Sequence, residues 1–235
     1  MFTIILCRPS HSGNVGAVAR AMKTMGLSKL ALVCPCDFLN EEALARARMG
    51  KSILENARVF KTLSDAIVDC ENVFGFSSRQ RDLNLPFLSV DSAFQAINAK
   101  TALVFGNETN GLSNEELQHC TRQVFIPTSE DFSSLNLAAA VQIAVYEVLK
   151  AQNRPTKNTN LPKRANAFER EHLIQSFQKA MEKTGFYNPN DPGRLIFRLC
   201  RLFNRADLEK TEAQILEGFL HSIFHPTAFR KKNDS

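Results

Sequence analysis

Short apolar runs alternate with amphipathic segments over the first 150 residues of this 235-residue chain. Strand-like runs lie at 2–7, 30–34, 57–60, 72–76, 102–105 and 123–126. Helical patterns lie between and after them at 14–25, 41–48, 63–69, 91–98, 113–119 and 135–150. Strands that alternate with helices form a mainly parallel sheet, because each helix crosses over the sheet to return the chain. We therefore expect an α/β domain whose sheet carries helices on both faces.

The remainder of the chain has a different character. Residues 153–165 are polar and basic and contain Pro155 and Pro162, which is typical of a linker. Helical patterns follow at about 166–184, 193–204 and 208–224, and Asp191-Pro192 fits the start of the middle helix. The sequence thus predicts an α/β domain at 1–152, a linker at 153–165 and a small helical extension at 166–235.

Positive charge is concentrated in this second part. Residues 1–150 hold 14 Lys and Arg against 15 Asp and Glu, whereas residues 151–235 hold 15 against 9. Four arginines of the middle helix recur at i, i+4, i+7 and i+11 and share one face: Arg194, Arg198, Arg201 and Arg205. The apolar side of the same helix holds Leu195, Ile196, Leu199, Leu202 and Phe203. Such a stripe suits the phosphates of RNA, and an exposed amphipathic helix is the alternative.

Targeting and cysteine patterns point to a cytoplasmic protein without metal. No apolar run approaches the roughly 18–20 residues that cross a membrane, and MFTIILCRPS lacks the features of a signal peptide. Cys34 and Cys36 form a C-x-C without a second pair, so we expect no metal site. Most of the remaining cysteines lie in or beside apolar segments, where we expect buried free thiols.

The loop after the first strand, SHSGNVGAVARAMKTMGL, opens a helix. Gly13 and Gly16 would let a ligand or another backbone approach closely. Their G-x-x-G spacing differs from the G-x-G-x-x-G of a dinucleotide-binding loop, and Asp37, the acidic residue near the end of the second strand, lies beyond Cys34-Pro35-Cys36. A nucleotide-dependent oxidoreductase is one alternative. Arg20 follows Gly16 by one helical turn, where it can face the same opening or remain a surface residue.

Two further loops also connect a strand to a helix. In ALVFGNETNGLSNEEL, residues 106–111 precede a helix that Ser113 and Glu116 can cap. In DFSSLNLAAAVQIAVYEVLK, Ser134 and Asn136 can cap the last helix, whose free N–H groups can also hold a ligand. Because loops at the carboxyl ends of parallel strands bind ligands, the three loops predict one shared site.

NVGAVAR at 14–20, GNETNGL at 106–112 and IPTSEDFSSLNL at 126–137 resemble the three ordered motifs of the SpoU, or TrmH-like, branch of the SPOUT methyltransferases. The resemblance covers about residues 1–150. It implies methyl transfer from S-adenosylmethionine to a ribose 2′-hydroxyl of RNA, not DNA. It also implies a trefoil knot in the C-terminal part of the α/β domain, and a homodimer with active sites at the interface. One departure is GNETNGL, since many relatives have a third glycine after the glutamate.

Three further sequence features indicate which RNA is methylated. GFSSR at 75–79, SSLNLA and the helical extension resemble the members that methylate tRNA at the first nucleotide of the anticodon loop, a cytidine or uridine. Ribosomal RNA is the alternative target, and a non-catalytic RNA-binding module of the same fold is the alternative class.

The resemblance also implies roles for individual residues. Catalytic roles fall to Arg20, Asn14, Glu108, Ser134 and Asn136. Cofactor contacts are expected at Ser77, Ser78, Phe105, Gly106, Asn107, Gly111, Ile126, Ser134 and Leu135. RNA contacts are expected at Arg20, Arg79, Arg194, Arg198, Arg201 and Arg205. The resemblance implies that Arg20 acts on the 2′-hydroxyl, either as its general base or, because arginine stays protonated, by binding the target and stabilising the developing oxyanion. Asn14 would position Arg20 or the ribose, and Glu108 would orient Arg20 or Asn14 through a hydrogen bond.

Overall fold

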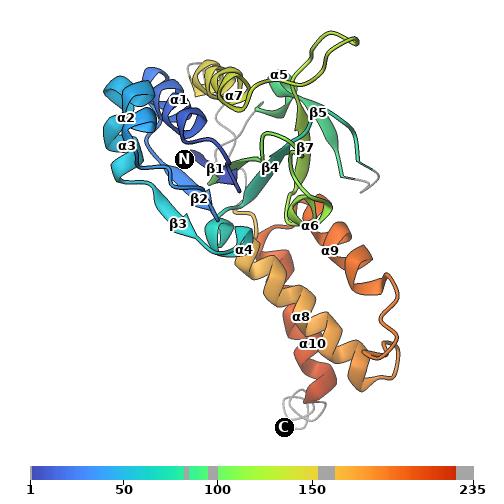
Figure 1. The fold of residues 1–235 in the computed structure, drawn as a ribbon. Coiled ribbons are helices and arrows are strands. Elements are labelled where there is room, and N and C mark those ends of the chain that lie inside the picture. The colour runs from blue at the N-terminus through green and yellow to red at the C-terminus, as the bar shows by residue number, and fades with distance from the viewer. Residues whose placement is uncertain (1, 82–84, 95–99, 153–161, 226–235) are drawn as a thin grey trace.

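The computed structural model describes residues 2–81, 85–94, 100–152 and 162–225 (Figure 1). Its strands form one seven-stranded sheet in the order β3-β2-β1-β6-β4-β7-β5, and each neighbouring pair is parallel. Their bounds are Phe2–Cys7 (β1), Leu30–Val33 (β2), Arg58–Phe60 (β3), Asn72–Phe76 (β4), Phe87–Ser89 (β5), Thr101–Phe105 (β6) and Arg122–Phe125 (β7). The six predicted strands are confirmed. Strand β5 was not predicted, because so short a strand has little periodicity.

The helices of the α/β domain are α1 (Ser12–Thr24), α2 (Glu41–Ala47), α3 (Lys51–Glu55), α4 (Leu63–Ile67), α5 (Val90–Ala93), α6 (Asn114–Gln118) and α7 (Leu137–Gln152). The predicted helices agree with this assignment apart from their ends, and α3 is additional. Residues 95–98 of the helix predicted at 91–98 lie outside the described residues.

Alternate residues of β1, an inner strand of the sheet, enter two separate cores. Ile4 and Leu6 of β1 pack with apolar residues of α1, α2 and α7. Ile5 and Cys7 point to the opposite face and pack with residues of α4 and α6. All four residues are fully buried. Helices thus cover both faces of the sheet, as the near-continuous apolar strands predict.

The first helix packs very closely on the second. A side chain at Gly16 would collide with the backbone carbonyl of Ala43 in α2, and one at Gly13 would collide with the Glu42 side chain. Both glycines lie inside α1, but only Gly16 meets backbone atoms, whereas the side chains near Gly13 can move aside. Helix packing therefore explains Gly16, and the dinucleotide-loop interpretation is not supported here.

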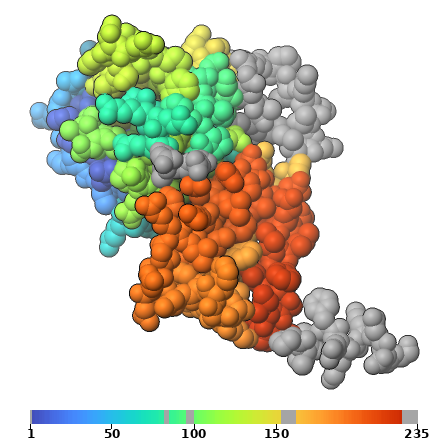
Figure 2. Space-filling model, turned by 90° about the vertical axis from the view of Figure 1, so that its right-hand side faces the viewer, coloured from blue at the N-terminus to red at the C-terminus, as the bar shows by residue number. Residues whose placement is uncertain are grey.

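The C-terminal extension contains α8 (Ala167–Lys183), α9 (Leu195–Arg205) and α10 (Lys210–Phe224), which project from the α/β domain as a lobe (Figure 2). Leu173, Phe203 and Leu220 form its small core, one from each helix. The three predicted helices are confirmed, but α9 begins at Leu195 after Arg194, and not at Asp191-Pro192. Leu202 belongs to the predicted apolar side and is nevertheless 44% exposed.

Buried polar contacts join this lobe to the sheet. Arg170 of α8 is 5% exposed, and its guanidinium donates to the carbonyls of Glu71 and Ala165 at 2.9 and 2.6 Å and to Asn204 Oδ1 at 3.2 Å. Asn204 in turn donates to the carbonyl of Gln118 at 2.6 Å. Burial lowers the pKa of Arg170 to about 10, so it stays charged at neutral pH. The predicted linker lies outside the described residues up to position 161.

None of the described helices is long and apolar enough to span a membrane.

Candidate active site

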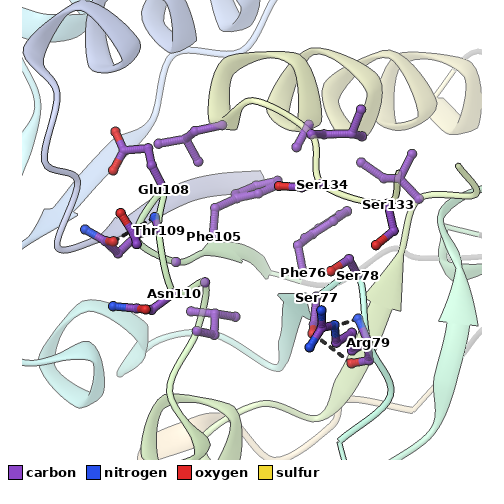
Figure 3. Close-up of a pocket in the computed structure, with 18 of the residues that line it drawn as sticks. Phe76, Ser77, Ser78, Arg79, Phe105, Glu108, Thr109, Asn110, Ser133 and Ser134 are labelled. Carbon is purple, nitrogen blue, oxygen red and sulfur yellow. Dashed lines mark hydrogen bonds between the residues drawn. The ribbon is translucent and has the colours of Figure 1, made fainter. Parts of the chain in front are cut away.

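A cavity of about 420 Å³ opens at the carboxyl ends of β4, β6 and β7. Its walls come from the loops that follow these three strands (Figure 3). Glu108, Thr109 and Asn110 lie on one side, whereas Ser77, Ser78 and Arg79 lie on another, below Ser133 and Ser134 in this view. This is the edge at which parallel α/β proteins bind ligands, and the volume suits a small molecule.

The 106–111 loop has a tightly closed shape. A side chain at Gly106 would collide with the carbonyl carbon of Gly111 and the amide of Leu112. Gly111 has a φ of +66°, which is the left-handed region that glycine adopts without strain. The Gly111 N–H donates to the Asn107 carbonyl at 2.8 Å. Glycines at both ends therefore let the loop close on itself and present its backbone to the cavity.

The helix after this loop is capped as predicted. The Ser113 hydroxyl accepts the N–H of Glu116 at 3.1 Å, and the Glu116 carboxylate accepts the N–H of Ser113 at 2.7 Å. The capping box is thus confirmed and sets where the loop ends.

Glu108 is held by donors from the β1–α1 connection and the first turn of α1. Its Oε2 accepts the N–H and the hydroxyl of Ser10 at 2.9 and 2.8 Å. Its Oε1 accepts the Nδ2 of Asn14 at 3.0 Å and the N–H of His11 at 3.3 Å. Partial burial acts to raise the pKa of this carboxyl, but the bonds from Asn14 and Ser10 outweigh it and lower the pKa to about 2. Glu108 is therefore ionised at any physiological pH.

Asn14 links Glu108 to the start of the last helix of the domain. Its Oδ1 accepts the Nδ2 of Asn136 at 3.1 Å. The Oδ1 of Asn136 accepts the N–H of Ala138 at 2.9 Å, which caps α7 as the sequence predicts. A chain of hydrogen bonds thus runs from α7 through both asparagines to Glu108, and it orients both amides. The predicted hydrogen bond between Glu108 and Asn14 is present.

The structure brings most of the predicted site residues together. All nine predicted cofactor residues line the cavity: Ser77, Ser78, Phe105, Gly106, Asn107, Gly111, Ile126, Ser134 and Leu135. Glu108 and Arg79 line it as well, whereas Asn14 and Asn136, which are linked to Glu108 by hydrogen bonds, are absent from the described lining. Arg20 is exposed on α1 and is not among the residues described around the cavity.

The predicted arginine stripe is only partly exposed. Arg198 and Arg205 are exposed on α9, and Arg194 is exposed at its start. Arg201 is half-buried beside Leu85 and Gln118 of the α/β domain. The four arginines therefore do not share one open surface, because α9 turns part of the stripe towards α6.

Arg81 is a lining residue that sequence reasoning missed. Its backbone N–H donates to Gln123 Oε1 at 3.1 Å and its carbonyl accepts Gln123 Nε2 at 3.3 Å. Gln123 is fully buried, so this contact fixes the loop after β4 against β7. The proximity of Arg81 to Arg79 in the sequence is the one signal that could have found it.

No group of three metal-ligating side chains occurs among the described residues. Cys7, Cys70 and Cys120 are buried free thiols as predicted, and burial raises the pKa of each. Cys200 is only partly buried, and of the C-x-C pair Cys34 is exposed and Cys36 is partly buried.

These features define a parallel α/β protein with a small-molecule cavity between three strand ends and a fixed carboxylate beside it. The model of the SpoU rRNA methylase family matches residues 1–146, and that of the C-terminal domain of tRNA methyltransferase TrmJ matches residues 169–233. The first match spans more than half of the chain, which therefore belongs to the SpoU methylase family.

The relatives are similar over nearly their whole length. The chain is 42% identical to tRNA (cytidine/uridine/adenosine-2′-O-)-methyltransferase TrmJ of Pseudomonas aeruginosa (strain UCBPP-PA14), covering 92% of this chain and 91% of that protein. It is 41% identical to tRNA (cytidine/uridine-2′-O-)-methyltransferase TrmJ of Sodalis glossinidius, covering 94% and 91%. The crystal structure of TrmJ from Z. mobilis ZM4 matches with a TM-score of 0.84 at 29% identity, covering 95% of this chain and 99% of that one.

Proposed function

We propose that this protein methylates the ribose 2′-hydroxyl of a cytidine or uridine in tRNA, with S-adenosylmethionine as methyl donor. The names of the two TrmJ relatives at 42% and 41% identity support the reaction and the substrate. The observation that carries the proposal is the hydrogen-bonded linkage of all three family motifs through Asn14 and Asn136 to Glu108, which lines the cavity. Because its proposed substrate is tRNA, we place the protein in the cytoplasm.

The cavity fits the cofactor by its shape and chemistry. The backbone of Phe105 and Gly106, with that of Ile126 and Leu135, would hold the adenine and ribose. S-adenosylmethionine supplies a methyl group activated on a sulfonium. Glu108 is the acidic side chain in the described lining, and its oxygens are occupied by Ser10, His11 and Asn14. Its role is therefore to hold Asn14.

The chain must bring a ribose oxygen into line and stabilise it as its proton leaves. Asn14 is held in one orientation by Glu108 and Asn136, so it is suited to position the ribose or a second polar group. Arginine is always charged, and Arg20 would bind the target and stabilise the developing oxyanion.

Because Arg20 is outside the cavity of its own chain, the proposal includes a homodimer in which Arg20 of one chain completes the site of the other. Exposed apolar residues beside the cavity and on α7 support a contact there: Phe132 is 73% exposed, Tyr146 49% and Leu135 37%. Burying such residues in a dimer would be favourable.

The proposal also includes the trefoil knot and the division at 1–152, 153–165 and 166–235. Strand β4 lies between β6 and β7, and after β7 the chain continues to α7, which packs against α1. The chain therefore passes from one side of β4 to the other between β6 and β7, and this path is compatible with a knot.

The helical lobe with its basic α9 would contact tRNA through Arg194, Arg198 and Arg205, together with Arg79 at the cavity.

Methyl transfer to unmodified tRNA transcripts tests the proposal, with the product mapped for 2′-O-methylation. We expect label at the first nucleotide of the anticodon loop. Arg20→Ala should lower the rate about a hundredfold or more, the usual loss of an oxyanion-stabilising group. Lys23→Ala, another exposed cation on α1, should keep the wild-type rate.

The alternatives give different outcomes of the same assay. Label on ribosomal RNA but not on tRNA would keep the reaction and change the target. Binding of tRNA with no methyl transfer to any RNA would support a non-catalytic RNA-binding module. Equal rates of methyl transfer in wild type and Arg20→Ala would show that Arg20 has no role in the active site.

A further inference from the structure

Arg8 contacts the 106–111 loop at both of its ends. Its backbone carbonyl accepts the Nδ2 of Asn107 at 2.8 Å. Its Nη2 approaches the carbonyl of Gly111 at 3.4 Å. Arg8 itself is not among the described residues that line the cavity. It therefore supports the loop from outside the cavity.

Arg8 also holds the helix that follows this loop. Its Nε and Nη2 donate to the two carboxylate oxygens of Glu116 at 3.0 and 2.7 Å, which is the bidentate arrangement of a strong ion pair. The side chain of Glu116 is only 13% exposed. Because Glu116 also closes the capping box of α6, one guanidinium connects the loop end and the helix start.

The backbone of Arg8 has a strained conformation, and hydrogen bonds to neighbouring residues hold it there. Its φ is +52°, in the left-handed region that residues other than glycine rarely adopt. The Arg8 N–H donates to the carbonyl of Val33 at the end of β2, at 2.8 Å, while its own carbonyl accepts from Asn107. Strained conformations of this kind persist where surrounding contacts fix them, and they cluster around ligand sites.

We propose that Arg8 is a positioning residue for cofactor binding, which holds the 106–111 loop in the closed shape that lines the cavity. The inference rests on the proposed S-adenosylmethionine site. Glu108 has its own donors in Ser10 and Asn14, so the catalytic side of the loop does not depend on the Arg8 side chain. Loss of that side chain should weaken cofactor binding much more than it slows methyl transfer at saturating cofactor.

Arg8→Gly is the sharpest variant, because glycine adopts a φ of +52° without strain and the variant removes only the interactions of the side chain. Calorimetric titration with S-adenosylhomocysteine, the reaction's proposed by-product, measures affinity without turnover. We expect the Kd to rise about tenfold, the equivalent of one charge-assisted pair. At saturating S-adenosylmethionine, kcat should stay within about twofold, and KM for tRNA should be unchanged.

Two further variants complete the design. Arg8→Lys keeps the charge but not the two parallel bonds, so its Kd should fall between those of wild type and Arg8→Gly, and it carries the test if Arg8→Gly does not fold. Lys210→Ala removes a comparable ion pair with Glu169, 2.6 Å long, in the helical lobe, and should leave the Kd unchanged.

A wild-type Kd in folded Arg8→Gly and Arg8→Lys would overturn the inference. A fall in kcat together with a rise in KM for tRNA would also overturn the inference. Such a pattern indicates that Arg8 supports the whole structure and not cofactor binding in particular. If wild type itself does not bind S-adenosylhomocysteine, the proposed function fails first and independently of Arg8.

Discussion

Asn14 and Glu108 stand 94 positions apart in the chain and share a hydrogen bond of 3.0 Å. The bond exists because β1 and β6 are neighbours in register, with Leu6 opposite Phe105, so the connections that follow them meet at one edge of the sheet. Asn136 joins the same network from the start of α7. The carboxylate of Glu108 thereby holds Asn14 directly and Asn136 through Asn14, and one network joins three distant segments.

Replacement of that carboxylate should slow methyl transfer. Glu108→Gln keeps the size of the side chain but puts an amide where Ser10 and Asn14 donate, so the network loses at least one acceptor. We expect kcat to fall about tenfold to a hundredfold. Steady-state assays would measure this, with circular dichroism to verify the fold. An unchanged kcat would contradict the role of Glu108 in holding Asn14.

The lowered pKa of Glu108 predicts a pH dependence of stability. Its pKa falls from the ordinary 4.5 to about 2 in the folded protein, so its contribution is fully present above pH 4.5 and is lost as the pH falls towards 2. The stability difference between wild type and Glu108→Gln should therefore shrink as the pH is lowered through this range. Urea unfolding at pH 6 and pH 3 would measure it, and a constant difference would refute the predicted linkage.

A matched pair of variants at Asn136 should separate its capping role from its link to Asn14. Asn136→Asp keeps an oxygen that accepts the N–H of Ala138 but loses the donor to Asn14, whereas Asn136→Ala loses both. We expect Asn136→Ala to cost about 1 kcal/mol of stability and Asn136→Asp much less. Methyl transfer should fall in both variants. Full activity in Asn136→Asp would show that the hydrogen bond to Asn14 is dispensable.

Arg170 should be a large single contributor to stability. Its removal in Arg170→Ala leaves the carbonyl of Glu71 and the side chain of Asn204 without their buried donor. The expected loss is about 3 kcal/mol, measured by urea unfolding. Arg164→Ala, which removes a more exposed ion pair with Asp207, is the comparison and should cost much less. A similar loss of unfolding free energy in both variants would contradict the claim that the burial of Arg170 makes its interactions more stabilising.

The exposed arginines of α9 should bind tRNA through its phosphates. Arg198→Ala together with Arg205→Ala should weaken binding and reduce the slope of log K against log salt by about one for each phosphate that is no longer neutralised. Arg58→Ala, an exposed cation on β3 at the far edge of the sheet, serves as control. Filter binding over a salt series would measure both. Unchanged slopes in the double variant would exclude α9 from the tRNA surface.

Local features of the sequence determined much of this protein. Alternating apolar runs located the strands except β5, and Ser113 with Glu116 marked the start of α6 to the residue. The resemblance of three motifs to the SpoU methyltransferases identified residues that line the cavity, and the local sequence explains why Gly106 and Gly111 lie at the ends of its closed loop. These properties depend on neighbours within one or two turns of the chain, which a sequence displays directly.

Tertiary structure alone decided the remainder. Gly16 serves the packing of α1 on Ala43, not a ligand, and Arg20 lies outside the cavity that its motif suggests. Sequence reasoning singled out neither Arg8 nor Arg170, and only the fold supplies Glu116 to the first and the carbonyl of Glu71 to the second. Their partners are about a hundred residues away and meet them only through strand order and domain packing. The free energy of such interactions comes from groups that no local periodicity can identify.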